Sequence, residues 1–242
     1  LEEFTDSTVT AADVNGDGVS DIIQIVPADI GSTESKTLLY VHKSQVGANG
    51  TITYASPARC VFRPECMVDD WSVRHLGLSI VDIDGDGIND IVLPYTSVLN
   101  VDGFKKFGLE YVLGRTVAAG YNDIGSKAKT GALSFYGNPP YCTASDFNND
   151  GKTELVFLES GKSGSYYKLH YIYHTYTEAD SLYEEISDMD LPSDPKKLIP
   201  GDFNNDGMAD LMVLYDNGYK IFYNNGGARD AMPFSNGNVR SG

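Results

Sequence analysis

Short apolar runs alternate with polar, glycine-rich segments along the whole chain, and four pairs of these runs enclose an acidic loop. The runs that lead into the loops are residues 9–12, 78–81, 142–145 and 198–201, and those that leave them are residues 22–26, 91–93, 155–158 and 211–215. Runs of this length match strands, and no segment has the 3.6-residue period of a three-turn helix. The pattern predicts an all-β chain in which each acidic loop joins two adjacent antiparallel strands.

The four acidic loops share one nine-residue pattern. Carboxylates occupy positions one, five and nine, Asn or Asp occupies position three, and glycine occupies position six, in Asp13–Asp21, Asp82–Asp90, Asp146–Glu154 and Asp202–Asp210. The loops begin 69, 64 and 56 residues apart (82−13, 146−82, 202−146). A single Asp- and Gly-rich loop is common on protein surfaces, but four copies with the same spacing indicate a shared role.

The spacing of the oxygen donors matches the needs of a hard cation. Calcium binds six to eight oxygens at about 2.3–2.6 Å, and position seven adds a backbone carbonyl to the side chains at positions one, three, five and nine. Glycine at position six permits the sharp bend. We predict up to four structural Ca²⁺ ions, one per loop, bound by Asp13, Asn15, Asp17, Val19, Asp21, Asp82, Asp84, Asp86, Ile88, Asp90, Asp146, Asn148, Asp150, Lys152, Glu154, Asp202, Asn204, Asp206, Met208 and Asp210. The alternative is four solvated turns without metal.

A third, tyrosine-rich strand is expected in each unit, at residues 38–42, 133–136, 167–173 and 219–223. The turn at Asn49-Gly50 predicts a fourth strand of the first unit at residues 51–54, and residues 94–130 read as an insertion in the second unit. Three or four strands repeated about every 60 residues are typical of β-propeller blades. We therefore expect a single β-propeller region over 1–242, with approximate repeats 1–77, 78–141, 142–197 and 198–242. It either closes with four blades or forms an arc of a larger propeller, and we favour the arc.

The loop pattern resembles a known repeat. Asp-x-Asn/Asp-x-Asp-Gly-x-x-Asp followed by an aliphatic strand is similar to the FG-GAP or VCBS repeat, found in integrin α-chain propellers and in many secreted bacterial proteins. The Asp-Phe-Asn-Asn-Asp-Gly form in the loops that start at Asp146 and Asp202 resembles the VCBS version, including blades of RHS-type proteins and Tc-toxin B subunits. The Phe-Gly and Gly-Ala-Pro signatures of FG-GAP repeats are missing. The resemblance implies calcium-loop blades and does not imply integrin-like ligand binding.

Charge narrows the classes of partner. The chain carries 34 acidic and 18 basic residues, a formal net charge of −16. Four bound Ca²⁺ ions would leave about −8, and a negative surface disfavours nucleic acid and anionic membranes. No apolar stretch is long enough to span a membrane, so we expect no membrane insertion. The start at Leu1 suggests part of a larger polypeptide, and loops of this kind suit the millimolar calcium outside cells.

Outside the acidic loops, few residues suggest a disulfide, a catalytic group or a binding site. Cys60 and Cys66 could close a small disulfide loop, and Cys142 is expected to be a buried small hydrophobe. His170 and His174 read as exposed or half-buried, and the acids at positions 184, 185, 188 and 190 read as a solvated loop. The Trp and Arg residues of segment 59–76 suit either an interface or structural packing.

We predict a non-enzymatic calcium-binding β-propeller module of a secreted or cell-surface protein, which binds or scaffolds a protein or glycan ligand. The resemblance leaves two alternatives. One is a propeller-based polysaccharide lyase or hydrolase, with its cleft sought in segments 59–76 and 94–130. The other is a lectin that binds carbohydrate without turnover. Fold alone does not decide between them.

Overall fold

The computed structural model describes residues 8–27, 37–62, 71–75, 78–99, 104–120, 127–136, 142–160, 166–172, 186–191, 194–226 and 232–241. Over these residues the chain is all-β apart from one short helix, α1 (Gly114–Ala118). Every strand pairing is antiparallel, and the strands form four sheets of four or five strands and one two-stranded hairpin. The predicted fold class is therefore confirmed at the level of an all-β chain of antiparallel sheets.

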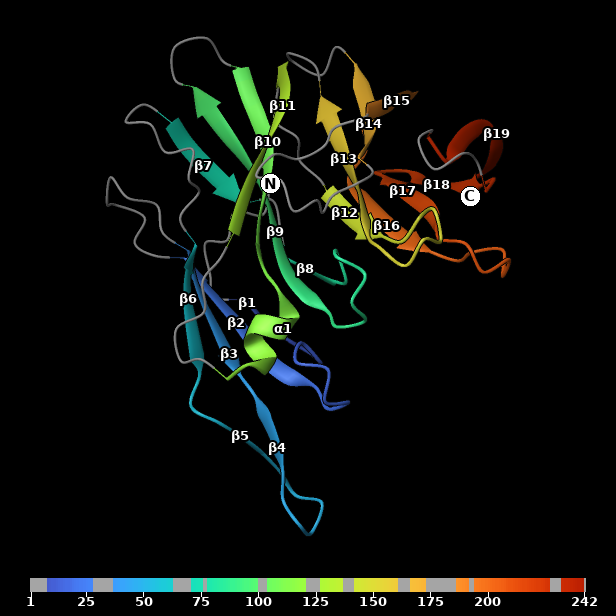
Figure 1. The fold of residues 1–242 in the computed structure, drawn as a ribbon. Coiled ribbons are helices and arrows are strands. Elements are labelled where there is room, and N and C mark those ends of the chain that lie inside the picture. Colours follow the sequence, from blue (N-terminus) through green and yellow to red (C-terminus); the bar gives the residue numbers. More distant parts are fainter. Residues whose placement is uncertain are drawn as a thin grey trace.

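The four sheets follow one another along the chain (Figure 1). The first sheet has the order β1 (Thr8–Ala12), β2 (Asp21–Pro27), β3 (Thr37–His42), β6 (Ala58–Phe62). The second contains β7 (Trp71–His75), β8 (Ser79–Val81), β9 (Asp90–Leu99), β10 (Phe104–Val112) and β11 (Lys127–Tyr136), in which β7 and β8 both pair with β9. The third has the order β12 (Cys142–Ser145), β13 (Glu154–Ser160), β14 (Tyr167–Ile172), β15 (Ile186–Leu191). The fourth has the order β16 (Lys197–Gly201), β17 (Asp210–Tyr215), β18 (Gly218–Asn224), β19 (Phe234–Ser241).

Three hydrophobic cores lie between successive sheets. The first core joins β2 and β3 to β9 and β10, the second joins β9 and β10 to β13 and β14, and the third joins β13 and β14 to β17 and β18. Neighbouring residues of β13 point into different cores, since Leu155 lies in the second and Val156 in the third. Strands buried on both faces need continuous apolar runs, which explains the runs that follow each acidic loop. Among the described residues no core joins the fourth sheet to the first.

The strands on either side of each acidic loop are confirmed. The loops connect β1 to β2, β8 to β9, β12 to β13 and β16 to β17, and each connected pair is antiparallel. The expected third strands at 38–42, 167–173 and 219–223 correspond to β3, β14 and β18.

Two strand predictions are wrong. The third strand of the second sheet is β10, and residues 133–136 belong to the fourth strand, β11, so much of the expected insertion at 94–130 is regular sheet and helix α1. Residues 51–54 do not form the fourth strand of the first sheet, which is β6. They contribute β5 (Ile52–Tyr54), which pairs with β4 (Ser44–Val46) in a separate hairpin. The fourth sheet takes its last strand, β19, from its own residues. Residues 1–7 lie outside the described part of the chain.

Candidate metal centres

The carboxylate at position one organises each loop. One of its oxygens accepts the backbone N–H of the glycine at position six, at 2.8–3.0 Å in all four loops, from Gly18, Gly87, Gly151 and Gly207. These glycines have φ between +83° and +84°, a region that residues with a Cβ rarely occupy. The glycine therefore supplies both the bend and a donor that fixes the position-one carboxylate.

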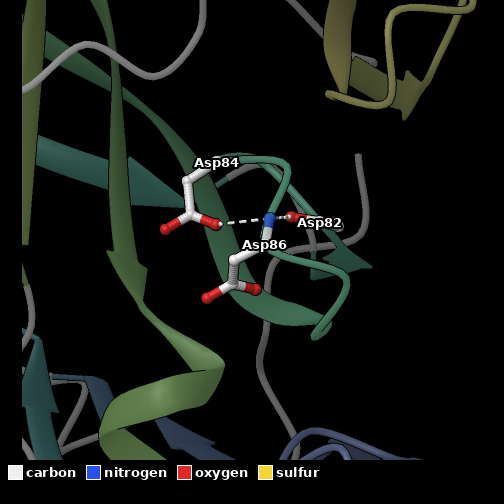
Figure 2. Close-up of side chains that lie close together, drawn as sticks. All are labelled: Asp82, Asp84 and Asp86. Atoms are coloured by element: carbon white, nitrogen blue, oxygen red, sulfur yellow. Dashed lines mark hydrogen bonds between the residues drawn. The ribbon is translucent and has the colours of Figure 1, made fainter.

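The second and third loops each bring three acids together. The carboxylate oxygens of Asp82, Asp84 and Asp86 lie within 4.8 Å of one another, as do those of Asp146, Asp150 and Glu154. Figure 2 shows the first group, in which the backbone N–H of Asp86 donates to Asp82 and Asp84 at 3.2 Å each. Both clusters have the composition to hold a metal ion, because they offer several hard oxygen donors at one point.

A cation of the protein already contacts the second loop. The guanidinium of Arg115, on helix α1, pairs with Asp84 and lies 3.3 Å from Asp86. Burial raises the pKa of Asp84 and the charge of Asp86 raises it further, while Arg115 lowers it. Arg115 thus neutralises part of the charge that a metal ion would neutralise.

The first and fourth loops hold their oxygens differently. The acids at positions one, five and nine of these two loops lie within the described residues, but they do not form a cluster like those of loops two and three. In both loops the position-three amide donates to the position-five carboxylate, from Asn15 to Asp17 at 3.1 Å and from Asn204 to Asp206 at 2.8 Å. The structure therefore brings together three of the predicted ligands in each of loops two and three. In loops one and four it leaves an amide NH₂ beside the position-five carboxylate.

The acid at position nine is buried in every loop and links the loop to the rest of its sheet. Asp21, Asp90 and Asp210 are each 0% exposed, and one oxygen of each accepts the N–H of position two at 2.9–3.2 Å. The other oxygen accepts an N–H at 2.8 Å from a residue at or just beyond the end of the third strand, namely Ser44, Gly114 or Asn224. These three donors were not predicted from the sequence. They are backbone N–H groups of three different residue types, so no shared residue marks them.

Glu154 fills position nine of the third loop in another way. Its Oε2 accepts the backbone N–H groups of Phe147 at 2.9 Å and Asn148 at 3.3 Å. Burial raises its pKa to about 8, and the charges of Asp150 and Asp146 add to the rise. Burial also raises the pKa of Asp90 to about 6 and that of Asp21 above its ordinary value. In each case the largest cause of the rise is the burial of a negative charge.

The backbone N–H at position seven is held within each loop. The N–H groups of Val19, Ile88, Lys152 and Met208 each donate to the position-five carboxylate at 2.9 Å. The carbonyl of Val19 also accepts a hydrogen bond from the Ser44 hydroxyl at 3.4 Å. The predicted metal contact of these carbonyls stays a prediction.

Neighbouring loops are bonded to one another in series. The side chain of Asn89 donates to the carbonyl of Asp13 at 3.0 Å, and the N–H of Thr153 donates to the carbonyl of Asp82 at 3.1 Å. Between the third and fourth loops, Asn149 donates to Gly207 at 3.3 Å. The buried side chain of Asn224 donates to Phe147 at 2.6 Å. The four loops therefore form a continuous row along one edge of the sheets.

Outside the loops, a polar cluster joins β13 to the beginning of β14. Glu159 accepts a hydrogen bond from the Tyr166 hydroxyl at 2.7 Å, and its other oxygen lies 2.7 Å from Nε2 of His170, which stacks on Phe157. His170 is 8% exposed, so its prediction as exposed or half-buried is wrong, because it packs at the edge of the core between the second and third sheets. His174 lies outside the described residues.

The remaining candidates are partly described. Residues 188 and 190 lie in strand β15 and not in a solvated loop, although Asp190 itself is exposed. Residues 184 and 185 lie outside the described part, as does Cys66, so the predicted disulfide is not tested. Cys60 is buried in the first core, and Cys142 packs half-buried against the second, where burial raises the pKa of its thiol. Of segment 59–76, only 59–62 and the strand β7 are described.

Comparison with known protein families and with curated proteins finds no match for this chain. The chemistry of the loops is therefore inferred from their own atoms. The side chains at positions one, three, five and nine of the loops are carboxylates and amides, and the predicted ligand at position seven is a backbone carbonyl. Oxygen donors of this kind prefer calcium, magnesium or manganese to softer metals. No helix within the described residues is long and apolar enough to cross a membrane.

Proposed function

We propose that the chain is a calcium-binding β-propeller module in which the metal is structural. The observation that carries this proposal is the repeated position of the acidic loop, which connects two adjacent antiparallel strands in each of the four sheets and ends in a buried acid. A loop that recurs at the same place in each sheet serves the architecture of the sheets. A single functional site would need only one copy.

The arrangement of the sheets supports the propeller. Four sheets pack face to face through three cores in series, and strand β12 lies against β8 on one side and β16 on the other, as the first strands of neighbouring blades would around an axis. The described residues provide cores for an open row of four blades. We therefore propose an arc of a larger propeller over a closed four-bladed one.

Calcium is the cation that the loops suit best. Magnesium demands near-ideal octahedral geometry and keeps several waters, whereas calcium accepts six to eight oxygens in irregular cages. Loops one, three and four offer carboxylate, amide and backbone oxygens, and loop two offers carboxylate and backbone oxygens. The buried acids with raised pKa, above all Glu154 and Asp90, supply sites where a divalent ion would relieve the cost of burying charge.

We propose that the module is not an enzyme and serves in binding or scaffolding a protein or glycan ligand, within a secreted or cell-surface protein. Among the described residues, the carboxyl groups with clearly raised pKa are Asp21, Asp84, Asp90 and Glu154, and all four belong to the metal loops. A general acid would need such a group in a separate cleft. Calcium loops of this kind fit the millimolar calcium found outside cells.

The test is thermal unfolding of the purified protein in calcium and in excess EGTA, with a metal count by atomic emission. Calcium at 100 times its dissociation constant stabilises the folded state by about 2.7 kcal/mol per site. We expect two to four ions per chain and a melting temperature lower by at least about 10 °C in EGTA. A magnesium-only sample should resemble the EGTA sample. Unchanged melting together with no bound metal would refute the proposal.

A further inference from the structure

The second loop has one acid more than each of the other three. It carries carboxylates at positions one, three, five and nine, whereas the other loops have asparagine at position three. The additional acid is Asp84, which lies beside Asp82 and Asp86 in Figure 2 and has a side chain only 3% exposed. A further negative charge held so close to others and away from water destabilises the fold unless a cation lies nearby.

Arg115 supplies that cation. Its Nη1 pairs with Oδ2 of Asp84 and lies 3.3 Å from Oδ2 of Asp86, so one nitrogen joins positions three and five of the loop. In loops one and four, the amide NH₂ at position three makes the corresponding contact with the position-five carboxylate, at 3.1 Å and 2.8 Å. Among the described residues, the acids of the other loops form no ion pair with a base. The pair of Asp84 and Arg115 therefore takes the place of the asparagine amide.

The backbone that carries Arg115 is fixed against the loops, whereas its side chain is not enclosed. The N–H of Gly114 donates to the buried carboxylate of Asp90 at 2.8 Å. A Cβ on Gly114 would lie 2.4 Å from the carbonyl oxygen of Asn89 and 3.1 Å from that of Val14, so glycine is needed for helix α1 to begin so close to both loops. The side chain of Arg115 is 49% exposed. The guanidinium can therefore turn into solvent while the start of α1 stays in place.

We propose that Arg115 is a resident cation of the second loop, and that calcium binds this loop by displacing the guanidinium from Asp84 and Asp86. The inference rests on the proposed calcium role and adds regulation of one site. Nη1 contacts two of the three acids whose oxygens lie within 4.8 Å of one another, and two cations at that point would repel each other. Arginine then holds the loop where calcium is scarce. The second loop should bind calcium more weakly than the third, whose three-acid cluster forms no such pair.

Calcium titration of the isotope-labelled, calcium-free protein by NMR reads the four loops separately. The position-six glycine of each loop donates its N–H to the position-one carboxylate, so Gly18, Gly87, Gly151 and Gly207 report one loop each. The midpoint is the calcium concentration at half of the signal change. We expect a higher midpoint for Gly87 than for Gly151. In Arg115→Gln the Gly87 midpoint should fall about threefold to tenfold, and the other three midpoints should stay within about twofold of the wild-type values.

Two further variants separate displacement from a general effect of charge. Asp84→Asn gives the second loop the asparagine of the other loops and removes a partner of Arg115. In that background, Arg115→Gln should change the Gly87 midpoint by less than about twofold, because the interaction it removes is already gone. The control Lys43→Gln removes the same charge near the other end of α1, where Nζ lies beside Gly120, and should leave the Gly87 midpoint within about twofold of the wild-type value.

Hydrogen exchange in EGTA tests whether arginine holds the loop without metal. Arg115→Gln should speed exchange of the Gly87 amide at least about threefold and leave that of Gly151 within about twofold. Unchanged exchange, an unchanged Gly87 midpoint, or a midpoint at higher calcium would overturn the proposal, the last because Arg115 would then hold the ligands in place for the metal. If no loop glycine responds to calcium, the calcium proposal fails and this inference with it. If all four respond and only the Arg115 results fail, the calcium proposal stands.

Discussion

Replacing Glu154 by Gln should have opposite effects on stability with and without calcium. Glu154 is 2% exposed, ends the third loop, and shares its site with Asp146 and Asp150. Gln has the same shape, and its side-chain oxygen can still accept the N–H of Phe147. The substitution therefore removes the negative charge while it keeps the main hydrogen bond. Without metal the buried negative charge destabilises the fold, and with calcium the carboxylate is a ligand.

The magnitude follows from the pKa, which burial raises from the ordinary 4.5 to about 8. A carboxyl group with a raised folded-state pKa stabilises the fold below the unfolded pKa, and this contribution is lost as the pH rises through the folded pKa. For these values the loss in the metal-free protein is about 1.4 kcal/mol at about pH 5.5 and about 4 kcal/mol at about pH 8. The Gln variant has no such loss. The free energy of unfolding of the metal-free Gln variant, relative to that of the wild type, should therefore rise by about 3 kcal/mol from about pH 5.5 to about pH 8.

Urea unfolding in EGTA and in calcium, at both pH values, measures this directly. In EGTA at about pH 8 we expect the variant to be more stable than the wild type, and in calcium less stable, because one charged ligand is missing. Asp190→Asn, an exposed change of the same charge in the same sheet, is the control and should shift neither curve by more than about 0.5 kcal/mol. Equal destabilisation in EGTA and in calcium would refute the reasoning, because Glu154 would then act only as a hydrogen-bond acceptor.

Three further substitutions test other parts of the structure. Arg115→Gln removes the guanidinium beside Asp84 and Asp86. Calorimetric titration should therefore show calcium binding at the second loop that is about threefold to tenfold tighter, and weaker binding would contradict this reasoning. Asn224→Ala leaves the carbonyl of Phe147 without its buried donor. The free energy of unfolding, measured in urea, should fall by about 2–4 kcal/mol with or without calcium. A loss of stability seen only in EGTA would argue against the role of Asn224 as a fixed link between the loops. Gly87→Ala adds a Cβ that meets no atom within 4 Å, but it places a residue with a side chain at φ +84°. Thermal unfolding should therefore show a stability lower by about 1–2 kcal/mol. An unchanged melting temperature would show that this backbone conformation is not strained.

The sequence by itself determined the all-β class, the four loops and the strands on either side of each. These features are local. The residues of a loop and of its flanking strands are adjacent in the chain, and the alternation of apolar runs with Asp, Asn and Gly follows directly from strand and turn chemistry. The loop glycines were predictable for the same reason, and Gly87 and Gly207 occupy the backbone conformation that the pattern requires.

Only the tertiary structure decided which strands complete each sheet and which groups reach the loops. Residues 51–54 have a strand sequence but contribute to a separate hairpin, because it is Ala58–Phe62 that pairs with β3. Arg115 reaches Asp84 from 31 positions away, and Ser44 reaches Asp21 from 23. Pairing partners and long-range contacts depend on how sheets pack against one another, and strand periodicity carries no information on that choice. The acids of the loops can therefore be identified from the sequence, whereas their burial and their neighbours depend on the fold.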